Sequence, residues 1–154
     1  MPKIVLVNPE IPPNTGNIAR TCAATGTPLH LVMPIGFELT DKYLKRAGLD
    51  YWPHVDLHIH ESIQDFWTCA ANESGKLIGF SARTTKSYTD IAYSPDDWLI
   101  FGKESQGLSA EARDRCDLLV TIPMPTNHVR SLNLSVSAAV GLFEAIRQTE
   151  KRPQ

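Results

Sequence analysis

Short apolar runs rich in β-branched and aromatic residues alternate with helical patterns along the whole chain, and this alternation constrains the fold most. Six such runs predict strands, at residues 4–7, 29–33, 55–59, 77–81, 98–101 and 118–122. Helices are expected between them, each beginning near a residue that can cap a first turn: Asn14, Thr40, Ser62, Ser109 and Asn133. The alternation predicts an α/β fold, in which a parallel six-stranded sheet carries helices on both faces.

The composition sets broad limits on function. A chain of 154 residues is the size of one ordinary domain. Its formal net charge of -2 at pH 7 gives no overall attraction to nucleic acid, so such a partner would need local basic patches. The chain offers two basic clusters, which are Lys42, Lys45 and Arg46, and Arg83 with Lys86. Clusters of this size are more often ordinary solvated surface.

The cysteines and the apolar runs indicate a reduced protein away from membranes. Cys22, Cys69 and Cys116 are odd in number and lack a Cys-x-x-Cys pairing, which argues against a disulfide framework or a zinc site. No apolar run approaches the roughly 20 residues of a membrane span. Because the chain passes from Met1 almost directly into a strand, we expect a cytoplasmic protein with no membrane partner.

Residues 9–26, PEIPPNTGNIARTCAATG, read as a loop running into a helix. With Asn14 as the N-cap, Asn17 and Arg20 recur at helical spacing on one polar face. A single arginine at such a place is usually a solvated surface residue. However, Asn14, Gly16 and Asn17 are poor helix formers crowded into one turn, and this local inconsistency favours a functional site.

The turn after the fifth predicted strand is rich in glycine. In residues 98–109, WLIFGKESQGLS, Glu104 lies between Gly102 and Gly107. Glycine at these positions permits a positive φ or the close approach of a ligand to the main chain. The pattern is weak evidence alone, because an ordinary strand-to-helix loop also explains it.

Residues 121–139, TIPMPTNHVRSLNLSVSAA, join the last predicted strand to the last helix. Pro123 and Pro125 remove backbone donors, while Ser131 and Asn133 can cap the helix start. Several amides and carbonyls are thereby left free for a small molecule. An ordinary connection remains the alternative interpretation of this segment taken alone.

Other common sites are not indicated. A dinucleotide site requires G-x-G-x-x-G after the first strand, but residues 8–13 read NPEIPP, and a Walker loop is also absent from the sequence. His58 and His60 alternate on one predicted strand without a clear third ligand, so we expect an exposed or interfacial strand face there and no metal.

Taken in order, the three segments resemble the motifs of the SPOUT family of RNA methyltransferases, the α/β-knot enzymes. The family's motifs match residues 14–20, 102–107 and 122–135, and the resemblance extends over essentially the whole chain. Within the family, the opening NPEIPPNTGNIARTCAATG, the middle KRAGLDYW and the closing RSLNLS look most like small tRNA enzymes acting on the wobble nucleotide. One departure is Phe143, where those enzymes carry tyrosine.

The resemblance implies one SPOUT domain over residues 1–154, with a deep C-terminal trefoil knot and a cofactor region at about 77–148. Connection rules alone would have rejected a knot. The implied cofactor is S-adenosyl-L-methionine. The positions that match its binding loops are Arg83, Gly102, Glu104, Ile122, Met124, Ser131 and Leu132.

The implied activity is 2'-O-methylation of the ribose of cytidine or uridine 34 in the anticodon stem-loop of tRNA, with leucine isoacceptors as substrates. The family assigns catalysis to the motif-one arginine, which is Arg20. Guanidinium groups keep their proton at neutral pH, so orientation and phosphate binding are easier roles than proton removal. The implied substrate-binding residues are Asn14, Asn17, Arg20, Arg130 and Asn133.

SPOUT proteins pair as homodimers, and we expect a dimer surface to recognise the tRNA. The small or apolar faces that could pair comprise Ala19, Ala23, Gly26, Ala138, Leu142 and Ile146. Packing of these faces within one chain is equally compatible with the sequence. Two other functions stay open, which are a SPOUT methyltransferase acting on a different RNA and a noncatalytic nucleotide- or RNA-binding domain.

Overall fold

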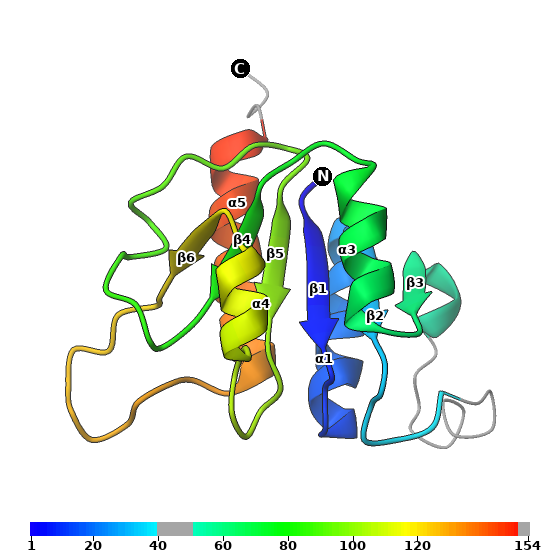
Figure 1. Ribbon diagram of the computed structural model, residues 1–154, viewed down its shortest axis with the longest axis horizontal. Helices are drawn as coiled ribbons and strands as arrows, with labels where there is room; N and C mark the ends of the chain where they lie inside the picture. Colours follow the sequence, from blue (N-terminus) through cyan, green and yellow to red (C-terminus); the bar gives the residue numbers. More distant parts are fainter. Residues whose placement is uncertain (40–50, 151–154) are drawn as a thin grey trace.

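The sheet contains six strands in the order β3-β2-β1-β5-β4-β6 (Figure 1). In this computed structural model, which describes residues 1–39 and 51–150, the strands are β1 (Lys3–Val7), β2 (Leu29–Val32), β3 (Leu57–His60), β4 (Leu77–Phe80), β5 (Trp98–Phe101) and β6 (Leu118–Val120). Every neighbouring pair is parallel. The predicted parallel six-stranded sheet is confirmed.

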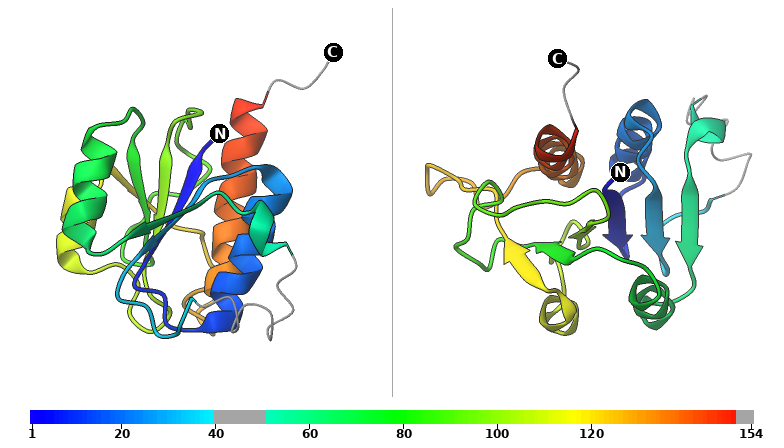
Figure 2. Two further views of the ribbon diagram at one scale, coloured as in Figure 1. Left: turned by 90° about the vertical axis from the view of Figure 1, so that its right-hand side faces the viewer. Right: turned by 90° about the horizontal axis from the view of Figure 1, so that it is seen from above.

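Helices cover both faces of this sheet, as Figure 2 shows from above. On one face lie α1 (Pro12–Thr25) and α5 (Leu134–Thr149), and on the other α3 (Ile63–Ala71) and α4 (Ala110–Arg115). A 3-10 turn, η1 (Trp52–His54), packs against α1. Within residues 1–39 and 51–150, none of the helices is long and apolar enough to cross a membrane.

Three helix starts are capped by the predicted residues. Ser62 Oγ accepts from the amide of Asp65 at 3.1 Å, and Ser109 and Asn133 cap α4 and α5 in the same way. Each side-chain oxygen satisfies an amide that the first helical turn leaves without a partner. The helix predicted near Thr40 lies outside the described residues.

The start of α1 differs from the prediction. The helix begins at Pro12, and its N-cap is Ile11, which makes no side-chain cap hydrogen bond. Pro12 and Pro13 fit the first helical positions, because an amide is not needed there and the proline φ already suits a helix. Asn14 is therefore an interior helical residue whose side chain is available for other contacts.

The core lies on both faces of the sheet. Leu6 and Leu142 belong to the cluster beneath α1 and α5, and Val5 and Phe66 belong to the cluster beneath α3 and α4. Successive strand residues point to opposite faces, and both faces are covered by helices. The central strands β1 and β5 can therefore be apolar over almost their whole length, which explains why they read as nearly continuous apolar runs.

The faces considered for chain pairing are mostly used inside the molecule. Ala19, Ala138 and Leu142 are at most 2% exposed, because α1 packs against α5. For these residues the intrachain alternative is the correct one. The large apolar side chains that α5 exposes are instead Val136 (46%) and Phe143 (54%).

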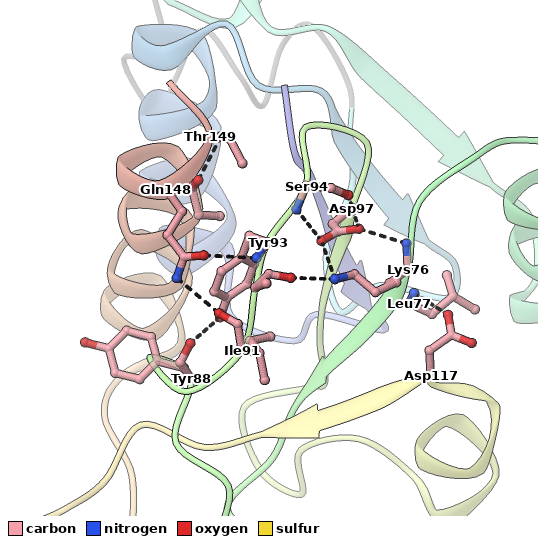
Figure 3. A network of polar contacts seen from close by, with 12 residues as sticks. Lys76, Leu77, Tyr88, Ile91, Tyr93, Ser94, Asp97, Asp117, Gln148 and Thr149 are labelled. Carbon is pink, nitrogen blue, oxygen red and sulfur yellow. Dashed lines mark hydrogen bonds and ion pairs between the residues drawn. The ribbon is translucent and has the colours of Figure 1, made fainter. Parts of the chain in front are cut away.

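The loop between β4 and β5, residues 81–97, is held by hydrogen bonds at its C-terminal end, next to β5 (Figure 3). Asp97 is fully buried and accepts from the amides of Lys76 and Ser94 at 2.9 and 2.8 Å. Gln148 of α5 accepts from the amide of Tyr93 at 3.0 Å and donates to the carbonyl of Ile91 at 3.2 Å. These bonds hold the loop against α5 although it contains no helix or strand of its own.

Candidate active site

A cavity of about 1040 Å³ lies where the carboxyl ends of four neighbouring strands meet. Its wall includes the residue that follows each of these strands, namely Asn8, Ser81, Gly102 and Thr121. Ligands of open parallel sheets characteristically bind at this edge, because the loops there are free to vary while the strands stay fixed. The fold therefore places the candidate site at its usual position.

Ten of the predicted site residues line this one cavity. They are Asn14, Arg83, Gly102, Glu104, Ile122, Met124, Arg130, Ser131, Leu132 and Asn133. The three motif segments, although far apart in the sequence, thus converge in space. Asn17 and Arg20 do not line the cavity, and both are exposed on α1.

Glu104 fastens the glycine-rich turn to the start of α1. Its carboxylate accepts from the amides of Glu10 and Ile11 at 2.8 and 3.1 Å, and the side-chain amide of Asn14 donates to it at 3.5 Å. Amides at a helix start have no partners within the helix, so a carboxylate stabilises them well. These contacts give Glu104 a positioning role at the cavity wall.

Glu10 makes the reciprocal connection. Its carboxylate accepts from the amide of Ser105 at 3.2 Å and from the Ser105 hydroxyl at 2.6 Å. These two hydrogen bonds lower the pKa of Glu10 below its ordinary value, since they favour the ionised carboxylate. The loop before α1 and the turn after β5 are thus joined by two carboxylates, each bonded to the other's segment.

The two glycines of the turn serve different purposes. Gly107 has a φ of 67°, in the left-handed region that favours glycine. Gly102 has no positive φ, but a Cβ there would lie 2.0 Å from the carbonyl carbon of Gly107. The close approach at Gly102 is therefore made by the chain's own backbone.

Apolar side chains form part of the cavity wall. The rings of Phe80 and Phe101, at the ends of β4 and β5, stack with centroids 4.5 Å apart. Ile122 and Met124 are half-buried, and Leu132 is 38% exposed. Partly exposed apolar groups around a concave site suit a flat organic ligand, which would cover them.

The sequence of this chain also matches a known protein family. The model of the SpoU rRNA Methylase family matches residues 1–143. The chain belongs to this family. Residues 1–143 include β1, every helix named above except the end of α5, and the whole cavity wall.

Individual members of the SpoU family are similar over nearly the whole chain. A protein from Synechocystis sp. is 61% identical over 96% of this chain and 97% of its own. The tRNA (cytidine(34)-2'-O)-methyltransferase of Methylovorus glucosotrophus is 49% identical over 94% of each chain. A structure solved to explain the 2-OH methylation of C/U34 on tRNA is 49% identical, with a TM-score of 0.87, over 96% of this chain and 95% of its own.

A more distant relative of known structure carries a ligand. The SpoU methyltransferase AviRb of Streptomyces viridochromogenes, solved in complex with AdoMet, is 26% identical with a TM-score of 0.80. The match covers 96% of this chain and 57% of that one. This chain therefore shares its fold with somewhat more than half of that AdoMet-bound methyltransferase.

Arg20 is held on the outer face of α1 in this SpoU family member. Its guanidinium carbon lies 5.2 Å from the centroid of the Tyr51 ring, so the cation faces an aromatic side chain. Within the part of the chain that the structure describes, Arg20 takes part in none of the ion pairs. In this structure the Tyr51 ring is therefore a contact of the Arg20 cation, and the cavity wall does not include Arg20.

Sequence reasoning missed some residues of the cavity wall. Asn8 has a φ of 54°, and its side chain donates to the carbonyls of Val32 and Pro34 at 3.3 and 3.1 Å. An asparagine directly after a strand was the available signal, because asparagine tolerates the left-handed region better than most residues. Lys103 and Arg113 also line the cavity and add positive charge to it.

The expected exposed or interfacial strand face holds for His58 but not for His60. His60 is only 9% exposed, and its Nε2 lies 2.9 Å from Nδ1 of the buried His30, while His58 is exposed and stacks on His30. Parallel pairing of β2 with β3 places these rings side by side. Among the described residues, no group of histidine, cysteine and acidic side chains could hold a metal ion.

Proposed function

We propose that this protein is an S-adenosyl-L-methionine-dependent methyltransferase that methylates the ribose 2'-hydroxyl of nucleotide 34, cytidine or uridine, in the anticodon loop of tRNA. The observation that carries the proposal is the convergence of three motif segments on one cavity. The relative from Methylovorus glucosotrophus and the structure concerning C/U34 support the choice of nucleotide. A trefoil knot at about residues 77–148, a cytoplasmic location and leucine isoacceptors as substrates belong to the same proposal.

The cavity wall fits the proposed cofactor. Its volume is close to the upper end of the range for small-molecule sites, about 300–1,000 Å³. Ile122, Met124 and Leu132 would cover the faces of the purine, and the Arg83 guanidinium would attract the cofactor's carboxylate. When bound, this cofactor supplies a methyl group on a positively charged sulfur. The residues of the chain then have to exclude water and orient the accepting hydroxyl.

The exposed side of the cavity would receive the RNA. Arg130, Ser131 and Asn133 are exposed along one rim, where they could bind phosphate and ribose groups. Methyl transfer requires the ribose oxygen to lie about 3 Å from the methyl group and in line with the departing sulfur. We assign these rim residues to holding nucleotide 34 in that position.

Arg20 would act in the cavity of a second copy of the chain. This assignment is supported by the absence of Arg20 and Asn17 from their own cavity wall. It is also supported by Val136 and Phe143, which expose apolar surface on α5 that a second copy would bury. In the resulting homodimer, the Arg20 guanidinium would bind a phosphate or orient the 2'-hydroxyl, as its charge and planar fork allow.

The decisive experiment incubates the purified protein with bulk tRNA and S-adenosylmethionine labelled in the methyl group, and then maps the labelled nucleotide. We expect 2'-O-methylcytidine or 2'-O-methyluridine at position 34. Arg20→Ala should abolish turnover while cofactor binding stays close to that of the unchanged protein. Full ribose methylation by this variant would refute the role of Arg20.

The same assay with ribosomal RNA added alongside the tRNA, together with a measurement of cofactor binding, separates the alternatives. Label in ribosomal RNA, with none in tRNA, would identify a SPOUT methyltransferase that acts on another RNA. Binding of the cofactor without transfer to any RNA would identify a noncatalytic binding domain. Either result would overturn the proposed substrate.

A further inference from the structure

Tyr51, which directly precedes η1, contacts the turn of α1 that carries Arg20. Its hydroxyl donates a hydrogen bond to the carbonyl of Gly16 at 2.6 Å. Its ring faces the guanidinium of Arg20, with 5.2 Å between the ring centroid and Cζ. Tyr51 is half-buried and packs against the core on the α1 side of the sheet. One side chain is thus fixed at its base and its tip, and presents its face to the cation.

The hydrogen bond from the Tyr51 hydroxyl is made to the turn of α1 that ends at Arg20. In an α-helix the carbonyl of residue 16 accepts the amide of residue 20, so Tyr51 bonds to the carbonyl that serves Arg20 itself. Movement of the Tyr51 ring is therefore coupled to the backbone position of Arg20.

An exposed arginine otherwise has many rotamers, and each must be given up when it binds a substrate. Since Arg20 forms none of the ion pairs found among the described residues, the Tyr51 ring is the contact that restricts it. A cation over an aromatic face keeps its hydrogen-bond donors directed outward, because the attraction uses the ring and not the N–H groups. The guanidinium therefore remains able to bind RNA.

We propose that Tyr51 is a positioning residue, which holds the Arg20 guanidinium in the orientation that it uses on the ribose or phosphate of the RNA. This inference rests on the proposed function, because Arg20 has an orientation to maintain only if it acts on that substrate. Tyr51 itself does not line the cavity, so its effect is exerted through Arg20.

The test compares two substitutions in the full-length protein. Tyr51→Phe keeps the ring and removes the hydroxyl, whereas Tyr51→Leu removes both. We expect Tyr51→Leu to lower kcat about tenfold, with an unchanged KM for the cofactor, and Tyr51→Phe to lower it less. Wild-type kcat in Tyr51→Leu would overturn the proposal.

A second background distinguishes positioning from a general structural effect. In Arg20→Lys, the cation is kept but the planar fork is lost. If Tyr51 acts through Arg20, Tyr51→Leu should lower kcat by a much smaller factor in this background than in the wild type. Equal losses in both backgrounds would show that Tyr51 only stabilises the fold, and would overturn the proposal.

A spectroscopic measurement tests the contact without any turnover. The Nε–H signal of Arg20, assigned by its absence in Arg20→Lys, should be shifted by the tyrosine ring current and should lose this shift in Tyr51→Leu. An unshifted wild-type signal would overturn the positioning role even if tRNA is methylated. If the signal shifts but the wild type transfers no methyl group to RNA, the proposed function fails and the positioning role fails with it.

Discussion

The side-chain amide of Asn133 donates to Oδ1 of Asn14 at 3.0 Å, across 119 residues of sequence. Asn133 Oδ1 also accepts from the amide of Ser135 at 2.8 Å, which caps α5. Asn14 in turn donates to Glu104. One chain of hydrogen bonds therefore connects α1, the turn after β5 and the start of α5, and it passes along the cavity wall.

Asn133→Ala should affect both stability and activity. The substitution removes the cap of α5, which costs about 1 kcal/mol of unfolding free energy. It also removes the hydrogen-bond donor to the side-chain oxygen Oδ1 of Asn14. Because Asn133 itself lines the cavity and bonds there to Asn14, kcat for tRNA methylation should fall as well. Urea unfolding and a methyl-transfer assay measure the two effects.

Ser62→Ala is the matched control for this prediction. It also removes a side-chain cap, that of α3, but Ser62 does not line the cavity. We expect a similar loss of unfolding free energy, about 1 kcal/mol, with wild-type kcat. Equal kcat in the two variants would show that Asn133 acts only as a helix cap.

The sequence predicted the elements well because the signals for them are local. A strand run such as residues 98–101 needs only neighbouring apolar residues, and the caps at Ser62 and Ser109 depend on a single turn. The start of α1 was misplaced because Asn14 is an equally good cap in isolation. Its engagement with Glu104, 90 residues away, was invisible in the local pattern.

The candidate site was predictable only in part for a related reason. The family resemblance located ten residues of the cavity wall, nine of them within the three motif segments and including Glu104. It could not reveal that the Glu104 carboxylate is bonded to backbone amides, nor that Arg20 lies away from its own cavity. Both facts depend on how α1 is oriented over the sheet, which follows from packing of the whole chain.

Gly102→Ala should prevent folding of the turn after β5. A Cβ at this position would lie 2.0 Å from the carbonyl carbon of Gly107 and 2.2 Å from the amide nitrogen of Leu108. Backbone atoms cannot move aside as a flexible side chain can, so we expect a loss of more than about 4 kcal/mol or an insoluble protein. Soluble yield and thermal unfolding measure this.

Gly26→Ala provides the comparison. Gly26 has a φ of 67° at the end of α1, but no atom lies within 4 Å of a Cβ placed there. Only the backbone strain of a left-handed alanine remains, which is about 1–2 kcal/mol. A Gly102→Ala protein as stable as Gly26→Ala would contradict the clash argument.

Stability should decrease in mild acid because of His30. This imidazole is 3% exposed, and burial together with the nearby His58, His60 and Lys3 lowers its pKa to about 3. The unfolded chain binds a proton at its ordinary pKa of 6.5, while the folded chain does not. The contribution of neutral His30 to the free energy of unfolding is therefore complete above about pH 6.5. It is lost as the pH falls toward about 3, by up to about 1.4 kcal/mol per pH unit for one proton.

His60 should add to this dependence in the same direction. Burial lowers its pKa and His58 contributes, while Asp65 and Glu73 oppose the shift. Urea unfolding between about pH 7.5 and about pH 5 measures the total slope. His30→Gln should flatten it, and His128→Gln, which changes an exposed histidine, should leave it unchanged. A pH-independent wild type would show that His30 takes up its proton as readily in the folded protein as in the unfolded chain, and would contradict the prediction.

Phe143→Glu should convert the proposed homodimer to monomers. Phe143 is 54% exposed on α5, and the exposed Val136 lies two turns earlier on the same face of the helix. A charge at position 143 would have to be buried when two copies pair through this face. Ile59→Glu is the control, because Ile59 is similarly exposed (46%) but lies on the edge strand β3. Light scattering after size-exclusion chromatography should report a monomer for Phe143→Glu and a dimer for the control.

Mixing two inactive variants tests whether Arg20 acts across that dimer. Arg20→Ala keeps an intact cavity, and Leu132→Asp keeps Arg20 but places a charge in the cavity wall. If Arg20 serves the partner's cavity, each mixed dimer has one complete site, so random exchange of subunits should restore roughly a quarter of wild-type activity. If Arg20 serves its own cavity, each subunit of the mixed dimer stays defective, and an activity no greater than that of the separate variants would contradict the assignment.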